Sequence, residues 1–299
     1  MLVRGGRLTH FITRKDTTMA KIDTLVDDIN GILDTGKVPN SANLGDLLDD
    51  MKSAIHKQMD PANRQRDNYL RMSNIGKGDR QVYYEVKGNP TAEVLTSDTR
   101  LKFLYGDIIE AILIYLAKEA GHEVEDEQAE VTIDGIKGHI DCKIDGAMVD
   151  VKSASAYGFK KFVTGSLFEA DAFGYIPQIS AYAHCKDTED AGFLVMDKVK
   201  GDLVYMDVPK EKRIDPVARI KHMKEVVAAD EPPPHCHDLV PEGKSGNMKL
   251  GVNCGYCPHK QECWKDSNDG KGLRLFLYST GPVWLGEVGK EPKVHEVVT

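Results

Sequence analysis

The stretch from Gly138 to Lys152, in which apolar and polar residues alternate, constrains the fold more than any other part of the chain. The alternation runs on both sides of Asp145-Gly146, a dipeptide that favours the tight turn between two antiparallel strands. Because successive side chains of a strand point to opposite faces, the pattern also predicts which residues share a face. The predicted faces are Ile140, Cys142 and Ile144 against His139, Asp141 and Lys143 on the first strand, and Val149 and Val151 against Met148, Asp150 and Lys152 on the second.

Asp141, Asp150 and Lys152 are thereby predicted to project from one face of a sheet whose other face is apolar. Two carboxylates held close together repel each other and raise each other's pKa unless a cation lies between them. A divalent metal ion bound by Asp141 and Asp150, with Lys152 beside it, removes this conflict. The residues therefore indicate a metal-dependent phosphodiesterase, specifically a DNA nuclease.

Leu101 to Ala120 has the pattern of the clearest helix in the chain, and Gly121 is predicted to end it. Glu110 of this helix is either hydrated at the edge of the apolar stripe or directed into the cleft of the two aspartates. Because the helix lies just upstream of the strands that carry the aspartates, we favour the second alternative. The expected stripe consists of Leu104, Ile108, Ala111, Ile112 and Leu116.

The other periodic segments predict an α/β core. Gln178 and Tyr182 lie four residues apart in a predicted helix and so share one face of it. The expected elements are a helical appendage at 22–59 broken at 36–43, a short strand or helix at 81–86, alternation over 123–133 ending at an Asp134-Gly135 turn, helices at 175–184 and 216–228, strands at 192–196 and 203–208, and two or three strands within 272–298.

Aromatic and basic residues interleave between Ser153 and Phe162, where Lys160 and Lys161 are adjacent. This mixture predicts a loop that binds the phosphate backbone of DNA and stacks on bases. Charged, aromatic surface loops are common, so an unspecialised loop is the alternative.

Four of the six cysteines lie in the C-terminal part of the chain, at Cys236, Cys254, Cys257 and Cys263. The turn inside a C-x2-C pair directs both sulfur atoms at one point, so the spacing predicts a metal knuckle. Cys142 and Cys185 occupy apolar strand or helix positions, and we expect them to be core thiols.

Composition limits the compartment and the mode of DNA binding. The formal net charge is −8, so any positive surface for DNA has to be local. Cysteines without a secretory signal indicate a reducing compartment, and no apolar run is long enough to span a membrane, which together predict a cytoplasmic protein. The basic start of the chain lacks the apolar region of a secretory signal; between a transit peptide and an extension upstream of a natural start at Met19, we favour the extension.

The set Gly106-x3-Glu110, Gly138-x2-Asp141, Asp150-x-Lys152 and Gln178-x3-Tyr182 resembles the PD-(D/E)xK nuclease superfamily. Within that superfamily the chain looks like the RecB-like exonucleases encoded by phages, akin to the CRISPR-associated RecB-type nucleases. The resemblance covers roughly 73 to 264 in the right order. It implies a restriction-endonuclease-like α/β fold, in which a central mixed sheet is flanked by helices.

The resemblance also implies roles for the matched residues. Asp141 and Asp150 would hold one or two Mg²⁺ or Mn²⁺ ions, with Glu110 as a further ligand or bridging through water. Lys152 would orient or deprotonate the attacking water, and Gln178, paired with Tyr182, would position the lysine or a phosphate. These assignments agree with the preference of hard cations for carboxylate oxygens and with the ability of a bound metal to generate hydroxide at neutral pH.

Many relatives hold an iron–sulfur cluster, and three of their cysteines match Cys254, Cys257 and Cys263. Their fourth cysteine lies upstream of the core, just before an arginine, where this chain reads Gly78-Asp79-Arg80. Cys236, His235 or His237 could supply the fourth ligand instead. We favour an iron–sulfur cluster over Zn²⁺ by a narrow margin, since thiolates with an optional imidazole suit both.

The sequence thus predicts a Mg²⁺-dependent DNA exonuclease of phage DNA degradation, replication or recombination, in the host cytoplasm if phage-encoded. The alternatives are a structure-specific endonuclease and a DNA-binding module that does not cleave. The sequence is compatible with a homo-oligomer and with a partner protein of phage replication or recombination. The expected divisions are an extension at 1–21, a helical appendage at 22–72, the nuclease core at 73–230, and a cysteine-rich tail with a β-hairpin at 231–299.

Overall fold

The computed structural model describes residues 21–64, 68–89 and 91–297, so nearly all of the extension expected at 1–21, including Met19, lies outside the described residues. The helices are α1 (Leu25–Thr35), α2 (Ser41–Met59), α3 (Asp79–Lys87), α4 (Ser97–Ala120), α5 (Ala156–Thr164), α6 (Tyr175–Cys185), α7 (Pro216–Ala228), α8 (Val252–Gly255), α9 (Lys260–Cys263) and α10 (Ser267–Gly270). The strands are β1 (Val124–Glu125), β2 (Glu130–Ile133), β3 (Ile136–His139), β4 (Cys142–Ile144), β5 (Ala147–Ala154), β6 (Ala191–Asp197), β7 (Leu203–Asp207), β8 (Val240–Pro241), β9 (Met248–Lys249), β10 (Arg274–Tyr278), β11 (Gly281–Glu287) and β12 (His295–Val297).

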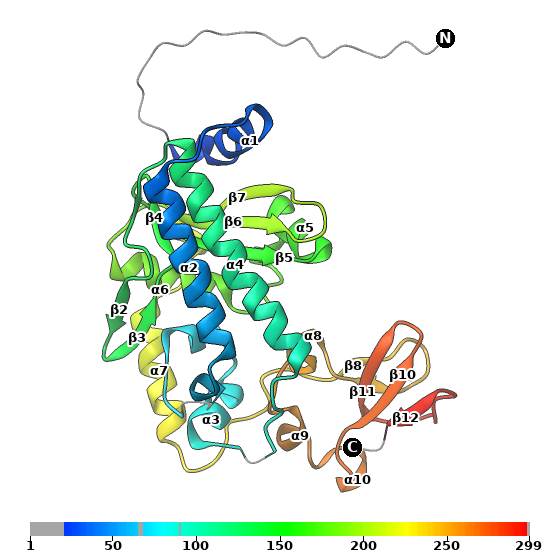
Figure 1. Ribbon diagram of the computed structural model, residues 1–299. Coiled ribbons are helices and arrows are strands. Elements are labelled where there is room, and N and C mark those ends of the chain that lie inside the picture. Colours follow the sequence, from blue (N-terminus) through cyan, green and yellow to red (C-terminus); the bar gives the residue numbers. More distant parts are fainter. Residues whose placement is uncertain (1–20, 65–67, 90, 298–299) are drawn as a thin grey trace, which may run out of the picture.

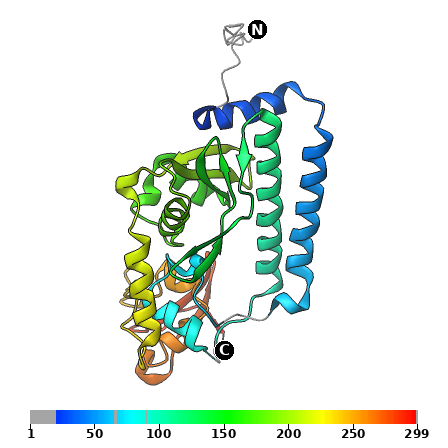
Figure 2. The same cartoon turned by 90° about the vertical axis from the view of Figure 1, so that its left-hand side faces the viewer.

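A mixed sheet lies at the centre of the described chain, with the strand order β1-β4-β5-β6-β7. Strands β5 and β6 are parallel, whereas the other neighbours are antiparallel. Helices cover both faces: α4 and α1 pack on one, and α5, α6 and α7 pack on the other (Figures 1 and 2). The α/β class and the central mixed sheet flanked by helices are therefore as predicted.

The turn at Asp145-Gly146 is confirmed. Both residues have positive φ angles, 50° and 83°, which is the conformation that the two central residues of a type I′ turn require. Ile144 pairs with Ala147 across the turn, and Val149 and Val151 do face away from Met148. The first predicted strand, however, is not continuous.

The break falls at Ile140 and Asp141, between β3 and β4. Strand β3 pairs with β2 in a separate two-stranded sheet through the predicted Asp134-Gly135 turn. Ile140 packs in the core beneath α6, whereas Cys142 packs in the core beneath α4, so the prediction that they share a face was wrong. The chain switches sheets at this point: the Ile140 N–H still donates to the Ala129 carbonyl next to β2, whereas Cys142 pairs with Val149 of β5.

Helix α4 begins at Ser97 and ends at Ala120, and Gly121 follows it with a φ of 96°, the left-handed conformation typical of a helix C-terminus. The predicted apolar stripe was right in part. Ala111 is buried and Leu116 packs against the core, but Ile112 is exposed, and the row Ile109, Leu113 and Ala117, spaced four residues apart, is buried as well. The stripe was ambiguous because α4 contacts α1, α2 and β5 at once.

The N-terminal helices pack on this same helix. Leu25 and Ile29 of α1 are fully buried in the core formed by α4 and the sheet. Helix α2 runs alongside α4 (Figure 2), and Asn43 donates a hydrogen bond of 2.8 Å to Glu119 near the end of α4. Gln58 at the other end of α2 donates one of 2.9 Å to Asp107.

The structure also decides the secondary structure of two shorter segments. Residues 81–86, expected as a strand or a helix, belong to α3. The segment 153–162, expected as a loop, largely forms α5, because the Ser155 side chain caps it by accepting the Gly158 N–H.

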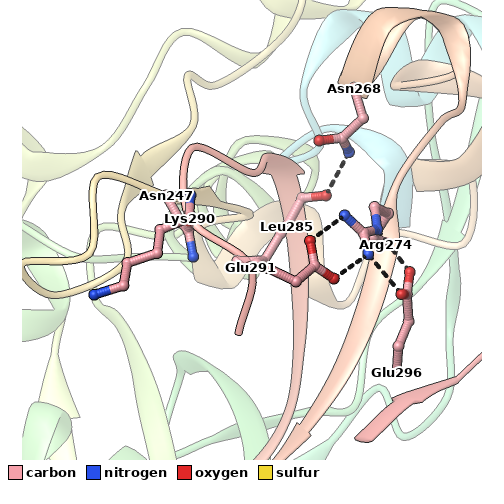
Figure 3. Close-up of polar contacts among 7 residues, drawn as sticks. All are labelled: Asn247, Asn268, Arg274, Leu285, Lys290, Glu291 and Glu296. Atoms are coloured by element: carbon pink, nitrogen blue, oxygen red, sulfur yellow. Dashed lines mark hydrogen bonds and ion pairs between the residues drawn. The ribbon is translucent and has the colours of Figure 1, made fainter. Parts of the chain in front are cut away.

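The C-terminal strands form a second sheet with the order β12-β10-β11-β9-β8, set apart from the central sheet in Figure 1. Arg274 of β10 donates two hydrogen bonds to each of Glu291 and Glu296, which ties the last strand to the sheet (Figure 3). Asn268 donates to the Leu285 carbonyl at 3.1 Å in the same view. Across the described ranges, no helix is long and apolar enough to cross a bilayer.

Candidate active site

Strand β5 places Asp150 and Lys152 on one side of the sheet, two residues apart. Asp150 is only 1% exposed, and its Oδ2 forms an ion pair with the Lys152 ammonium. Its Oδ1 is buried and receives no hydrogen bond from any described residue. A buried carboxylate oxygen without a partner is costly, so Asp150 retains the capacity to bind a further positive group.

Asp141 lies beside this pair. The register that pairs Cys142 with Val149 puts Asp141 opposite Asp150 on the adjacent strand. The Asp141 Oδ2 accepts the Val151 N–H at 2.7 Å, which fixes the carboxylate beside the backbone that joins Asp150 to Lys152. Asp141 lies between β3 and β4, and its carbonyl accepts the Gln128 N–H at 3.1 Å.

Glu110 reaches the same place from α4. The Gln128 side chain donates a hydrogen bond of 2.6 Å to its Oε1. Burial first, then repulsion from Asp141, raises the pKa of Glu110 to about 8, and the Lys152 charge only partly offsets this. Burial and the charge of Asp150 likewise raise the pKa of Asp141 to about 7. The three acids therefore lie close enough to destabilise each other's ionised forms.

Among the described residues, Lys152 is the cation that lowers the pKa of both Glu110 and Asp141, and Lys57 also acts on Asp141. Burial lowers the pKa of Lys152, but attraction to Asp150 and Asp141 outweighs burial and raises that pKa well above its usual value. Lys152 is consequently an ammonium that donates hydrogen bonds; it could act as a proton acceptor only after another cation had neutralised the acids.

Helix α6 covers the site with the predicted pair. Gln178 Nε2 donates a hydrogen bond of 3.0 Å to the Tyr182 hydroxyl, so the expectation of a shared face is met. Burial raises the pKa of the Tyr182 hydroxyl, and the charges of Asp150 and Asp141 act in the same direction. Tyr182 is thus a neutral phenol close to the acids.

Sequence reasoning missed Tyr175, at the start of the same helix. Its ring centroid lies 5.5 Å from the Lys152 Nζ, a distance that fits a cation–π contact. Tyr175, Gln178 and Tyr182 recur at helical spacing, three and then four residues apart, and this was the signal that could have found it.

A wide groove of about 2860 Å³ opens beside Lys152 and extends to the C-terminal sheet. Among the described residues, nine Lys or Arg line it against four Asp or Glu, whereas the whole chain has a net charge of −8. Lys161 lies in this lining, but its ammonium donates to the Ala170 carbonyl at 2.8 Å. Lys160 is exposed on α5 and does not line the groove.

The four C-terminal cysteines, Cys236, Cys254, Cys257 and Cys263, line one small cavity of about 30 Å³ together with His235, His237 and His259. Burial raises the pKa of the Cys257 thiol to about 11 and that of the Cys263 thiol to about 12. Metal binding requires deprotonated sulfur, so these thiols need a bound cation before they ionise. An atom added as Cβ on Gly78 would lie 2.4 Å from the Cys236 sulfur, so this cysteine fills the space beside Gly78.

Among the residues that the structure describes, no group of three or more His, Cys, Asp or Glu side chains is arranged to hold a metal ion. The cysteine knuckle expected from spacing is therefore not confirmed, and neither is a metal centre at the acids. The acids nevertheless fit a divalent cation by their chemistry, since Asp150 has a buried oxygen that accepts no hydrogen bond from the part of the chain that the structure describes, and Glu110 and Asp141 repel each other. In their present arrangement the Lys152 ammonium supplies the countercharge.

No family model matches the chain, and none of the curated proteins matches it. Among solved structures, it is similar to the crystal structure of SSO0001, with a TM-score of 0.38, 14% identity, and coverage of 70% of this chain and 91% of that one. It is also similar to LHK-Exo, an alkaline exonuclease from Laribacter hongkongensis, at 15% identity over 55% of this chain and 86% of that one. The TM-score is 0.36 for the complex with dAMP and 0.30 for the other LHK-Exo structure. An exonuclease is thus a structural neighbour, but scores this low carry no functional weight.

Proposed function

We propose that this protein is a Mg²⁺-dependent deoxyribonuclease that hydrolyses phosphodiester bonds, acting as an exonuclease in phage DNA degradation, replication or recombination. The observation that carries the proposal is the placement of Asp150 and Asp141 beside Lys152, whose side chain is ion-paired to Asp150 and which lines a groove with excess positive charge. Catalytic carboxylates next to a cationic groove combine cation binding with attraction for a phosphate backbone.

The three acids would together bind the divalent cation. Asp150 and Asp141 would hold Mg²⁺ or Mn²⁺, with Glu110 as the third carboxylate. When bound by these carboxylates, such a cation would supply Lewis-acid chemistry for phosphodiester hydrolysis and a lower pKa for water. The hydrogen bond from Val151 keeps the Asp141 carboxylate in place before any substrate arrives, which reduces the reorganisation needed for the reaction.

Lys152 would orient the attacking water or a phosphate oxygen as an ammonium. It is held between the Asp150 carboxylate and the Tyr175 ring, so its direction is fixed on both sides. Gln178 would position a phosphate or the lysine, and its bond to Tyr182 restricts its own rotamers. The lysines and arginines of the groove, Lys161 among them, would hold the DNA backbone, and the exposed Lys160 next to Lys161 on α5 would contact it from outside the groove lining.

The C-terminal cysteines would serve a separate, structural purpose. We propose that Cys254, Cys257, Cys263 and Cys236 hold an iron–sulfur cluster, with Zn²⁺ as the alternative, and that this group ties the tail to the nuclease core. The shared cavity supports the proposal, because all four cysteines line it.

Cleavage of end-labelled linear duplex DNA, with Mg²⁺ and then with a chelator, tests the function. We expect mononucleotides or short products with Mg²⁺ only. Lys152→Ala should abolish cleavage while leaving the circular dichroism spectrum unchanged, whereas Lys137→Ala, which removes an exposed lysine on β3, should cleave like the wild type. Cleavage of covalently closed circular DNA would show that the protein is an endonuclease and not an exonuclease. Cleavage by Lys152→Ala at the wild-type level would refute the proposed site.

A further inference from the structure

A row of aromatic rings leads from the candidate active site along the groove. Beginning at Lys152, the Tyr175 ring is 5.5 Å from the ammonium, the Phe173 ring is 5.7 Å from Tyr175, and the Tyr256 ring is 5.9 Å from Phe173. All three rings line the groove. Tyr256 belongs to the cysteine-rich segment, so the row joins two parts of the chain that are distant in sequence.

The outer rings of this row are unusually accessible. Phe173 is 56% exposed and Tyr256 is 75% exposed, whereas Tyr175 is half-buried against Phe162 and Phe193. Exposed apolar side chains scattered singly need no explanation. Two that contact each other across a positively charged groove, next to a candidate phosphodiesterase site, form a surface with flat apolar faces and nearby cations.

The backbone on both sides of Phe173 is held in one conformation. On one side, Asp171 accepts the N–H groups of Tyr175 and Ile176 at 3.0 and 2.8 Å and so caps α6. On the other, Gly174 has a φ of 73° and lies so close to Gly76 that a Cβ on either glycine would come within 2.4 Å of the other's backbone. An exposed ring on so constrained a backbone is preorganised for a contact, which lowers the entropic cost of binding.

We propose that Phe173 and Tyr256 form a stacking platform for unpaired bases, and that the nuclease therefore binds single-stranded DNA in this groove, with the strand directed toward Lys152. The inference rests on the proposed function. Bases of a duplex stack on each other and hide their faces, whereas bases of a single strand can stack on aromatic side chains in a groove that follows the backbone. The excess of Lys and Arg in the lining supplies the backbone contacts.

Binding of a fluorescein-labelled oligothymidylate to the full-length protein in chelator tests the platform without requiring cleavage. Truncation of one stacking ring removes about 1–3 kcal/mol per base, which corresponds to a roughly 5- to 150-fold weaker affinity. We therefore expect Phe173→Ala and Tyr256→Ala each to weaken binding about tenfold or more. Tyr256→Phe, which keeps the ring, should bind like the wild type.

Two controls separate stacking from general damage. Tyr105→Ala removes an α4 ring that is 45% exposed but does not line the groove, and it should not change binding. A strand in which abasic sites replace the bases should bind the wild type weakly and lose little more affinity with Phe173→Ala.

The proposal is overturned if Phe173→Ala weakens single-strand binding no more than Tyr105→Ala does, or if it weakens blunt duplex binding equally. The binding assay contains no divalent cation, so it reports on the platform whether or not the protein cleaves DNA. Normal binding with absent cleavage would reject the proposed function and keep the platform.

Discussion

Replacing Glu110 by glutamine should stabilise the metal-free protein at alkaline pH. Glutamine has nearly the same shape, and its amide oxygen can accept the hydrogen bond that Gln128 donates to Glu110. The substitution therefore removes a charge and little else. It acts on the residue whose ionised form burial and the neighbouring aspartates oppose most clearly.

The sign follows from the two states of the acid. Below the ordinary pKa of 4.5, Glu110 is protonated in both the folded and the unfolded chain, and no penalty arises. Between 4.5 and about 8, the unfolded chain releases the proton while the folded chain keeps it, so the free energy of unfolding falls as pH rises. Above about 8 both states are ionised and the loss is constant. The whole shift corresponds to at most about 5 kcal/mol.

Urea unfolding in chelator at pH 5 and pH 8.5, followed by circular dichroism, measures this effect. We expect the free energy of unfolding of Glu110→Gln to exceed that of the wild type by about 1 kcal/mol or less at pH 5 and by up to about 5 kcal/mol at pH 8.5. Glu125→Gln, on a half-exposed β1 carboxylate paired with Lys143, should show no such pH dependence. An equal or lower stability of Glu110→Gln at pH 8.5 would refute the repulsion among the acids.

Three further variants test other parts of the structure. Gly174→Ala should lower the free energy of unfolding by about 1–3 kcal/mol in urea, because alanine disfavours a φ of 73° and its Cβ would meet the Gly76 backbone; unchanged stability would contradict the close contact. His122→Ala should lower the free energy of unfolding by about 1–3 kcal/mol, because the buried imidazole forms a 2.7 Å hydrogen bond with Asp145 and its loss leaves that carboxylate without this partner. A urea midpoint equal to that of the wild type would contradict a stabilising role of this hydrogen bond. Cys236→Ser should lower the iron or zinc content of anaerobically purified protein, measured by metal analysis and visible absorbance, and a full content would exclude Cys236 as a ligand.

Local patterns predicted the parts of the fold that local chemistry decides. The Asp145-Gly146 turn follows from residues that tolerate positive φ, and α7 spans the predicted 216–228 because Asp215 caps it and Pro216 begins it. Gln178 and Tyr182 share a helix face, as their spacing of four residues predicts. Asp150 and Lys152 share a face of β5, as the period-two alternation of a strand predicts.

Features that depend on distant segments could not be read from the sequence. The buried row of α4 was misassigned in part because several elements compete for that helix, and the break before Cys142 lies where the chain passes from pairing next to β2 to pairing with β5. The positive groove collects lysines and arginines from segments far apart in the chain, so the total charge of −8 conceals it. The contact between Phe173 and Tyr256 is equally non-local.

Titration with Mn²⁺, followed by the electron paramagnetic resonance of the free ion, tests most directly whether the acids share a cation. We predict that the wild type and Lys152→Ala bind Mn²⁺, whereas Asp150→Asn, which neutralises the buried carboxylate at the centre of the site, loses most of this binding. Equal Mn²⁺ binding by Asp150→Asn and the wild type would contradict the account.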